Sequence, residues 1–164
     1  MSKNEITIKQ LELSIKHYLE LICNGMTENL ARRNLVEHSD VYARYLKLKH
    51  ASPYKITNVS LISEKAKKLV DKNEHKNMLR CEHGYPKKAF VTKLIEMYKN
   101  LNNKLDKEHI NKFIKTSWDV AYITKEEDEE ITKLGYHSKH SSTSKKRWEK
   151  CGIKIIDNPY YKKK

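Results

Sequence analysis

The stretch WDVAYITKEEDEEITKLG, residues 118–135, holds the clearest strand-to-helix junction in the chain. Its first seven residues, 118–124, are apolar and aromatic, which is typical of a short buried strand. Thr124 followed by Glu127 three positions later forms a capping-box pattern, in which each side chain accepts a hydrogen bond from a backbone N–H of the other residue. A buried strand followed at once by a capped helix that ends at Gly135 is therefore expected.

The segments on either side of this junction predict mostly helices. Apolar residues recur at helical spacing in several places, and the polar residues 37–40 separate two of these runs. The expected helices cover about 8–22, 27–36, 41–48, 63–70, 86–101, 105–114 and 145–150, and the expected extended segments cover 54–62, 78–85 and 153–156. The last of these could be a closing strand beside residues 119–123.

This pattern predicts a mainly α (α+β) fold with about six helices and a small two- or three-stranded sheet. Because the chain contains no linker rich in Gly, Ser or Pro, we predict one globular domain over residues 1–157 and a basic C-terminal tail at 158–164. Two short helices around a turn within residues 27–50 also leave open a helix-turn-helix.

The charge of the chain indicates its class of partner. The 34 Lys and Arg residues exceed the 21 Asp and Glu residues, which gives a formal net charge of +13 at pH 7. A field of this sign attracts polyanions, and contacts with phosphates release counterions. Nucleic acid, DNA or RNA, is the favoured partner, and an acidic protein surface is the alternative. The basic residues expected to contact nucleic acid are Arg32, Arg33, Arg44, Lys87, Lys88, Lys139, Lys145, Lys146 and Arg147.

Composition and motifs exclude several other classes. The chain has no run of 18 uncharged apolar residues and no apolar signal-peptide segment, so no membrane association is expected. The three cysteines, Cys23, Cys81 and Cys151, are widely spaced and odd in number, which favours a reducing, cytoplasmic location. P-loop, GxGxxG, GxSxG and HExxH patterns are absent from the sequence.

Two polar segments leave alternatives open. The run Glu126, Glu127, Asp128, Glu129 and Glu130 fits the first turns of a helix, where the macrodipole favours acidic residues. It could also bind a protein partner by mimicking phosphates, as an inhibitor of a nucleic-acid-handling enzyme would. The loop 136–144 holds His137 and His140 and could contact phosphates, bind a metal or be a plain loop.

The segment RCEHGYP, residues 80–86, places an acidic residue before a histidine and a proline three positions after it. Together with Asn100 and His109, this segment resembles the site of HNH (ββα-metal) nucleases. The resemblance implies that His83 is the general base, that Glu82 and His109 bind Mg²⁺ or Mn²⁺, and that Asn100 orients the base. The family places a second strand and a loop between its first His and its Asn, whereas residues 87–101 predict one helix here.

The sequence therefore predicts a small basic nucleic-acid-binding protein. Its many Lys, Asn and Ile residues indicate AT-rich codon usage, and on this composition we expect an origin in a phage or mobile element. A metal-dependent HNH-like endonuclease and an interaction protein that uses the acidic run are the alternatives.

Overall fold

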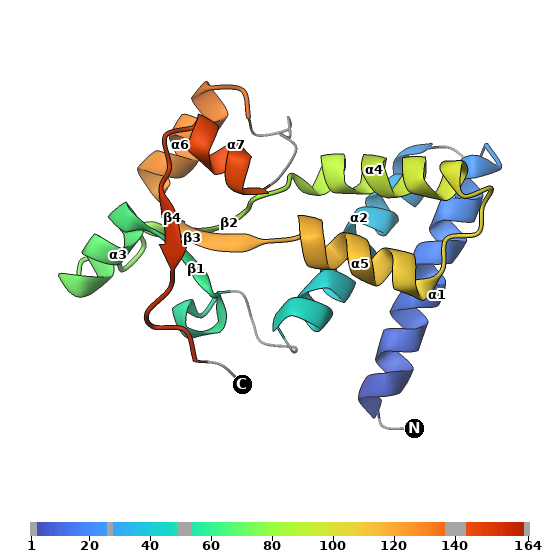
Figure 1. Cartoon of the computed structure of the whole chain (residues 1–164), viewed down its shortest axis with the longest axis horizontal. Coiled ribbons are helices and arrows are strands. Elements are labelled where there is room, and N and C mark those ends of the chain that lie inside the picture. The colour runs from blue at the N-terminus through green and yellow to red at the C-terminus, as the bar shows by residue number, and fades with distance from the viewer. Residues whose placement is uncertain (1–2, 26–27, 49–53, 137–143, 163–164) are drawn as a thin grey trace. The chain divides into compact units, whose positions relative to one another are not determined.

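The computed structural model describes residues 3–25, 28–48, 54–136 and 144–162, and it excludes the side chains of residues 3–7, 28, 144 and 145. Seven α-helices and one four-stranded sheet lie in these ranges (Figure 1). The mainly α fold is therefore confirmed. The chain divides into two compact units, unit 1 with residues 1–50 and 87–116 and unit 2 with residues 51–86 and 117–164. The prediction of a single domain over residues 1–157 stays a prediction.

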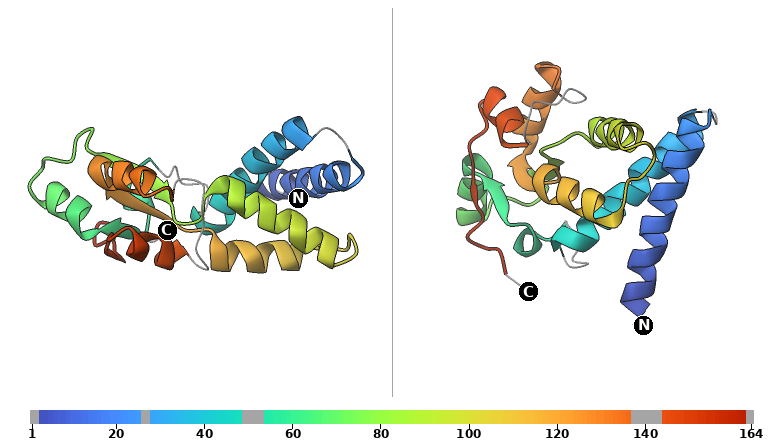
Figure 2. Two further views of the ribbon diagram at one scale, coloured as in Figure 1. Left: turned by 90° about the horizontal axis from the view of Figure 1, so that it is seen from above. Right: turned by 45° about the vertical axis from the view of Figure 1, so that its right-hand side comes forward.

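Unit 1 is helical. Its elements are α1 (Lys3–Cys23), α2 (Glu28–Leu48), α4 (Lys87–Asn100) and α5 (Lys107–Ser117). Helices α1 and α2 pack against each other, and α4 packs on both, as Figure 2 shows from two sides. Apolar residues at helical spacing form the core of this unit. Within it the rings of Phe90 and Phe113 stack, with their centroids 4.6 Å apart.

Helix α2 runs without a break through the polar residues 37–40, so the predicted interruption and the helix-turn-helix are both wrong. Asp40 is buried, and its Oδ2 lies 3.1 Å from Nη2 of Arg44 and 2.9 Å from Nζ of Lys87. A buried carboxylate is tolerated when it is paired, so the helix continues. Thr27 precedes this helix and has the residue type of an N-cap, but it lies outside the described residues.

Unit 2 contains the sheet, with β1 (Leu61–Ser63), β2 (Leu79–His83), β3 (Val120–Thr124) and β4 (Ile155–Asp157) in the order β2-β3-β1-β4. Strands β1 and β3 are parallel, and the other two pairs are antiparallel. Strand β3 is buried along its whole length, as its sequence predicts. The closing strand β4 pairs with β1 rather than with β3, and the sheet has four strands rather than two or three.

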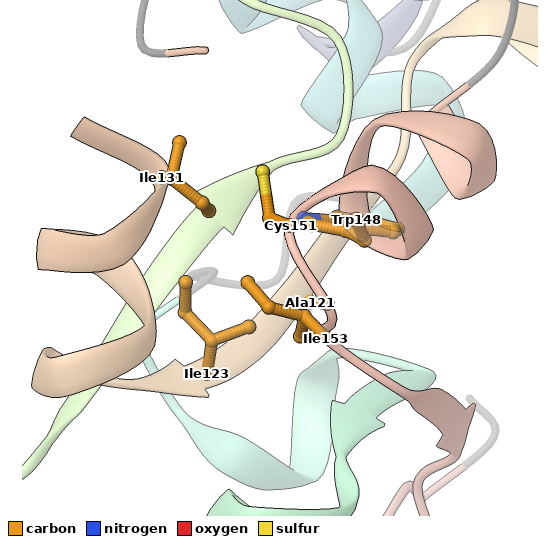
Figure 3. Close-up of a cluster of buried hydrophobic side chains, with 6 residues drawn as sticks. All are labelled: Ala121, Ile123, Ile131, Trp148, Cys151 and Ile153. Atoms are coloured by element: carbon orange, nitrogen blue, oxygen red, sulfur yellow. The ribbon is translucent and has the colours of Figure 1, made fainter. Parts of the chain in front are cut away.

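The helices of unit 2 are α3 (Glu64–Asp71), α6 (Lys125–Lys133) and α7 (Ser144–Lys150), with a short 3-10 helix η1 (Ile56–Asn58) before β1. One core cluster lies among β3, α6, α7 and the segment after α7 (Figure 3). Its residues are Ala121, Ile123, Ile131, Trp148, Cys151 and Ile153. None of the helices in the described ranges is long and apolar enough to cross a membrane.

The part of the predicted tail that the structure describes, residues 158–162, is bonded to unit 2. Nδ2 of buried Asn158 donates to the carbonyls of Ile56 and Val59 at 2.7 and 2.6 Å. The backbone N–H of Lys162 donates to the carbonyl of Thr57.

The starts of α3 and α6 share one buried carboxylate. Ser63 and Thr124 are the N-caps of the two helices, and they end the parallel strands β1 and β3. Oε2 of Glu127 accepts hydrogen bonds from the hydroxyl of Ser63 at 2.6 Å and from the backbone N–H of Thr124 at 2.8 Å. The predicted capping box is therefore present and extends to a second helix.

Replacing Glu127 with Ala is expected to lower the free energy of unfolding by about 2–3 kcal/mol, because two buried donors lose their acceptor. Urea denaturation followed by circular dichroism measures this change. Glu126→Ala, an exposed neighbour in the same helical turn, is the matched control and is expected to change stability by about 0.5 kcal/mol or less. Equal effects of the two substitutions would contradict this role of Glu127.

Candidate nucleic-acid interface

The polar face of α5 displays three lysines, Lys107, Lys112 and Lys115. The opposite face is anchored by Ile110 and Ile114, which are fully buried in unit 1. Lys112 lies opposite this anchor, whereas Lys107 and Lys115, eight residues apart, lie with Asn111 in one row along the flank of the helix between the two.

The start of α5 is fixed by Asp106, as its position before the helix predicts. Oδ1 of Asp106 accepts a hydrogen bond from the backbone N–H of His109 at 2.9 Å and contacts Nδ1 of the same residue at 2.6 Å. These two contacts, with the backbone one larger, hold the pKa of Asp106 below its usual value. A carboxylate at this position stabilises the helix start.

A hollow of about 670 Å³ lies along this polar face. Its lining contains Lys107, Glu108, Asn111, Lys112, Lys115 and Thr116. Among the described residues, no carboxylate forms an ion pair with any of the three lysines. The hydroxyl of Thr116 donates to the carbonyls of Lys112 and Phe113, and Glu108 adds one carboxylate to the lining. The three ammonium groups and the Asn111 amide are the donors that suit a ligand rich in anionic oxygens.

Two hydrogen bonds from α2 hold α5 at Asn111 and at Lys115. The hydroxyl of Tyr42, which is fully buried, donates to Oδ1 of Asn111 at 2.9 Å. Nζ of Lys47 donates to the backbone carbonyl of Lys115 at 2.7 Å. The hollow therefore lies beside a helix whose orientation is fixed by hydrogen bonds as well as by its apolar face.

The basic residues that the sequence predicts as nucleic-acid contacts differ in burial and in hydrogen-bond partners. Nη1 of Arg32 donates to the hydroxyl of Thr92 at 3.1 Å, and Arg44 and Lys87 pair with Asp40 as described above. The side chains of Arg33, Lys88 and Lys146 are exposed. Lys139 and the side chain of Lys145 lie outside the described part of the chain.

Arg147 is buried, with only 1% of its side chain exposed. Its Nη1 donates to Oε1 of Glu82 at 2.7 Å and to the carbonyl of His83 at 2.6 Å, and its Nε donates to the carbonyl of Tyr136 at 3.0 Å. The guanidinium thus connects α7, the end of β2 and the segment after α6 inside unit 2. We do not include Arg147 in the candidate interface.

The residues of the HNH resemblance are distributed over both units. Glu82 and His83 lie in unit 2, and Asn100 and His109 lie in unit 1. Neighbouring residues of a strand point to opposite faces of a sheet. Glu82 accordingly pairs with Arg147 on one face, whereas the ring of His83 lies edge-on to Trp118, with centroids 5.6 Å apart, on the other.

Asn100 is exposed at the last position of α4, and His109 is bound to Asp106. Both residues precede β3, the strand that pairs with β2, whereas the family places its second strand before its Asn. Within the described ranges, no three His, Cys, Asp or Glu residues form a group that could hold a metal ion.

The acidic run lies on α6, where its members have different settings. Glu127 is buried in the capping network, and Glu126, Glu129 and Glu130 are exposed. A second hollow, of about 300 Å³, is lined by Lys65, Glu126, Glu127, Glu129, Glu130, Lys133, Cys151, Gly152 and Ile153. Burial raises the pKa of the Cys151 thiol, so the thiol stays protonated at neutral pH.

Sequence reasoning missed the three lysines of α5. Their signal is present in the sequence, since Lys107 and Lys115 flank Asn111 at four-residue spacing and Lys112 lies opposite Ile110. Lysine is frequent throughout this chain, and helical spacing alone does not show which lysines line a concave surface.

Comparison of the chain with models of protein families, with curated proteins and with solved structures finds no match.

Proposed function

We propose that this protein binds nucleic acid and that the hollow along α5 contacts its phosphates. The observation that supports this proposal most directly is the lining of that hollow, where three lysines without a described acidic partner lie beside the amide of Asn111, with Glu108 as the one carboxylate. Lysine and asparagine are among the side chains that contact phosphate oxygens in protein–nucleic acid complexes. The exposed Arg33, Lys88 and Lys146 extend the set of candidate contacts.

The electrostatics of the whole chain agree with this function. The net charge of +13 accelerates the approach of a polyanion and produces an affinity that falls with salt. The charge pairs inside the fold use Arg44, Lys87 and Arg147, so the proposed contacts come from a different set of basic residues.

Replacing Lys107, Lys112 and Lys115 together with Gln is expected to weaken binding to a labelled duplex about tenfold or more at 50 mM salt. The slope of log K against log salt should become shallower by about 2–3, because each lost phosphate contact removes close to one unit. Fluorescence anisotropy over a salt series measures both quantities.

The matched control replaces Lys68, Lys72 and Lys76 of unit 2 with Gln, which removes the same charge from exposed positions. If both triple variants lose affinity equally, binding follows net charge and the assignment to α5 is wrong. Absence of binding by the parent protein to DNA and RNA at 50 mM salt would reject the function itself.

A metal-dependent nuclease is the second candidate, and one observation favours it. Strands β2 and β3 pair in antiparallel and α6 follows β3 at once, which is a ββα arrangement in space like that of the HNH family, with α4 and α5 inserted between the two strands in the chain. His83 ends β2 in this arrangement. The pairing of Glu82 with Arg147 means that a metal there would use the other carboxylate oxygen, Oε2, or displace the guanidinium.

If this second candidate is right, the protein nicks plasmid DNA or cleaves RNA with Mg²⁺ or Mn²⁺, and chelation stops the reaction. His83→Ala should then reduce the rate at least about a hundredfold while binding is retained, because a general base contributes roughly that factor. Agarose gels of plasmid nicking provide the measurement. A folded His83→Ala protein that cuts at the parent rate would reject His83 as the base.

A protein partner of the acidic run is the third proposal, and the hollow beside α6 supports it. Glu126, Glu129 and Glu130 are the exposed members available to a cationic partner, whereas Glu127 is occupied in the fold.

The triple variant Glu126→Gln, Glu129→Gln and Glu130→Gln is expected to abolish binding of a labelled oligo-arginine peptide and to leave nucleic-acid affinity equal or higher, because the change removes only negative charge. Titration calorimetry measures the peptide affinity. Unchanged peptide binding would remove this proposal.

The cytoplasmic location and the origin in a phage or mobile element stay predictions from cysteine usage and composition.

A further inference from the structure

We propose that Asn111 is an oriented hydrogen-bond donor at the centre of the hollow along α5, positioned by Tyr42 to hold one backbone phosphate of the bound nucleic acid. The hollow then recognises the sugar–phosphate backbone and binds nucleic acid of any base sequence. This inference rests on the proposed function and adds a binding mode to it.

The position of Asn111 along α5 supports a central place for it in the hollow. Lys107 lies four residues before it and Lys115 four residues after it, so each ammonium-bearing side chain is about one helical turn, roughly 6 Å, away on the same face. All three residues line the hollow. A phosphate bonded to the Asn111 amide would therefore have a positive charge on either side along the helix.

The partner of the amide determines which of its two ends is available. Tyr42 is fully buried in unit 1, and its hydroxyl donates to Oδ1 of Asn111 at 2.9 Å. Burial, with a smaller effect from the charge of Glu12, raises the pKa of Tyr42 to about 12. The phenol therefore keeps its proton at neutral pH and remains a donor, so the oxygen of the amide is engaged and the NH₂ group is the end left for a ligand.

An amide held in this way suits a phosphate better than a base. Asparagine reads adenine by donating with its nitrogen and accepting with its oxygen at the same time. The buried Tyr42 takes one of the two lone pairs of Oδ1 and holds that end of the amide, so the NH₂ group is the freer end, and phosphate oxygens need only donors. The ammonium groups of Lys107 and Lys115 are donors too, and neither has a side-chain acceptor among the described residues, so these three groups together favour backbone contacts.

The test measures affinity and its salt dependence for Asn111→Ala, Asn111→Asp and Tyr42→Phe, with two labelled duplexes of the same length, one AT-rich and one GC-rich. Loss of the amide in Asn111→Ala, or of its orientation in Tyr42→Phe, is expected to weaken binding about five- to tenfold with an unchanged salt slope, because the lysines remain. Asn111→Asp keeps an acceptor for Tyr42 and places a carboxylate against the phosphate, so a loss of about a hundredfold is expected.

The control for lost tyrosine hydroxyls is Tyr160→Phe in unit 2, which removes a hydroxyl that donates to Asp71 and should leave binding unchanged. Circular dichroism melting of each variant confirms that it is folded, and Asn111→Ala provides the readout if Tyr42→Phe unfolds.

The outcomes separate this inference from the function on which it rests. Parent-like binding by Asn111→Ala and Asn111→Asp, or a parent affinity that differs more than about tenfold between the two duplexes, would overturn the inference while nucleic-acid binding stands. A parent protein that binds neither duplex would overturn both. Weaker binding at an unchanged salt slope, with similar affinity for the two duplexes, supports the inference.

Discussion

The carboxylate of Glu127 is the constraint on which unit 2 depends. It accepts from Ser63 at the end of β1 and from Thr124 at the end of β3, and these two residues also cap α3 and α6. A buried carboxylate is stable only while its donors stay in place. A shift of β1 against β3 would take the Ser63 hydroxyl away from this carboxylate, so the network favours the observed parallel register of the two strands.

The basic residues of this chain have two separate roles. Arg147, Arg44 and Lys87 compensate carboxylates inside the fold, and Arg147 also satisfies the carbonyls of His83 and Tyr136. Lysines such as Lys112 and Lys115 lie on polar faces, where they take no part in described ion pairs. Total charge does not show this division, because it counts both sets of residues alike.

The fold was predictable where the signal is local and was missed where it depends on distant residues. The capping box at Thr124 and the buried strand before it follow from a few neighbouring residues, and both are present. Asp40 lies in the polar stretch that predicts a break in α2, and it pairs with Lys87, 47 positions away, as well as with the nearby Arg44, so local polarity alone is misleading there. The sequence predicts Arg147 as a surface cation because its partner Glu82 is 65 positions away.

The topology explains why the candidate interface is separate from the sheet. Strands β2 and β3 are neighbours in the sheet, yet the segment between them contains α4 and α5. The two ends of this insertion are held together, since the backbone N–H of Gly84 donates to the carbonyl of Asp119 at 2.9 Å. Helix α4 of the insertion packs with α1 and α2, and α5 buries Ile110 and Ile114, so the polar faces of α5 are under little packing constraint. Lysines can accumulate on those faces without disturbing the buried network of the sheet, which is what α5 shows.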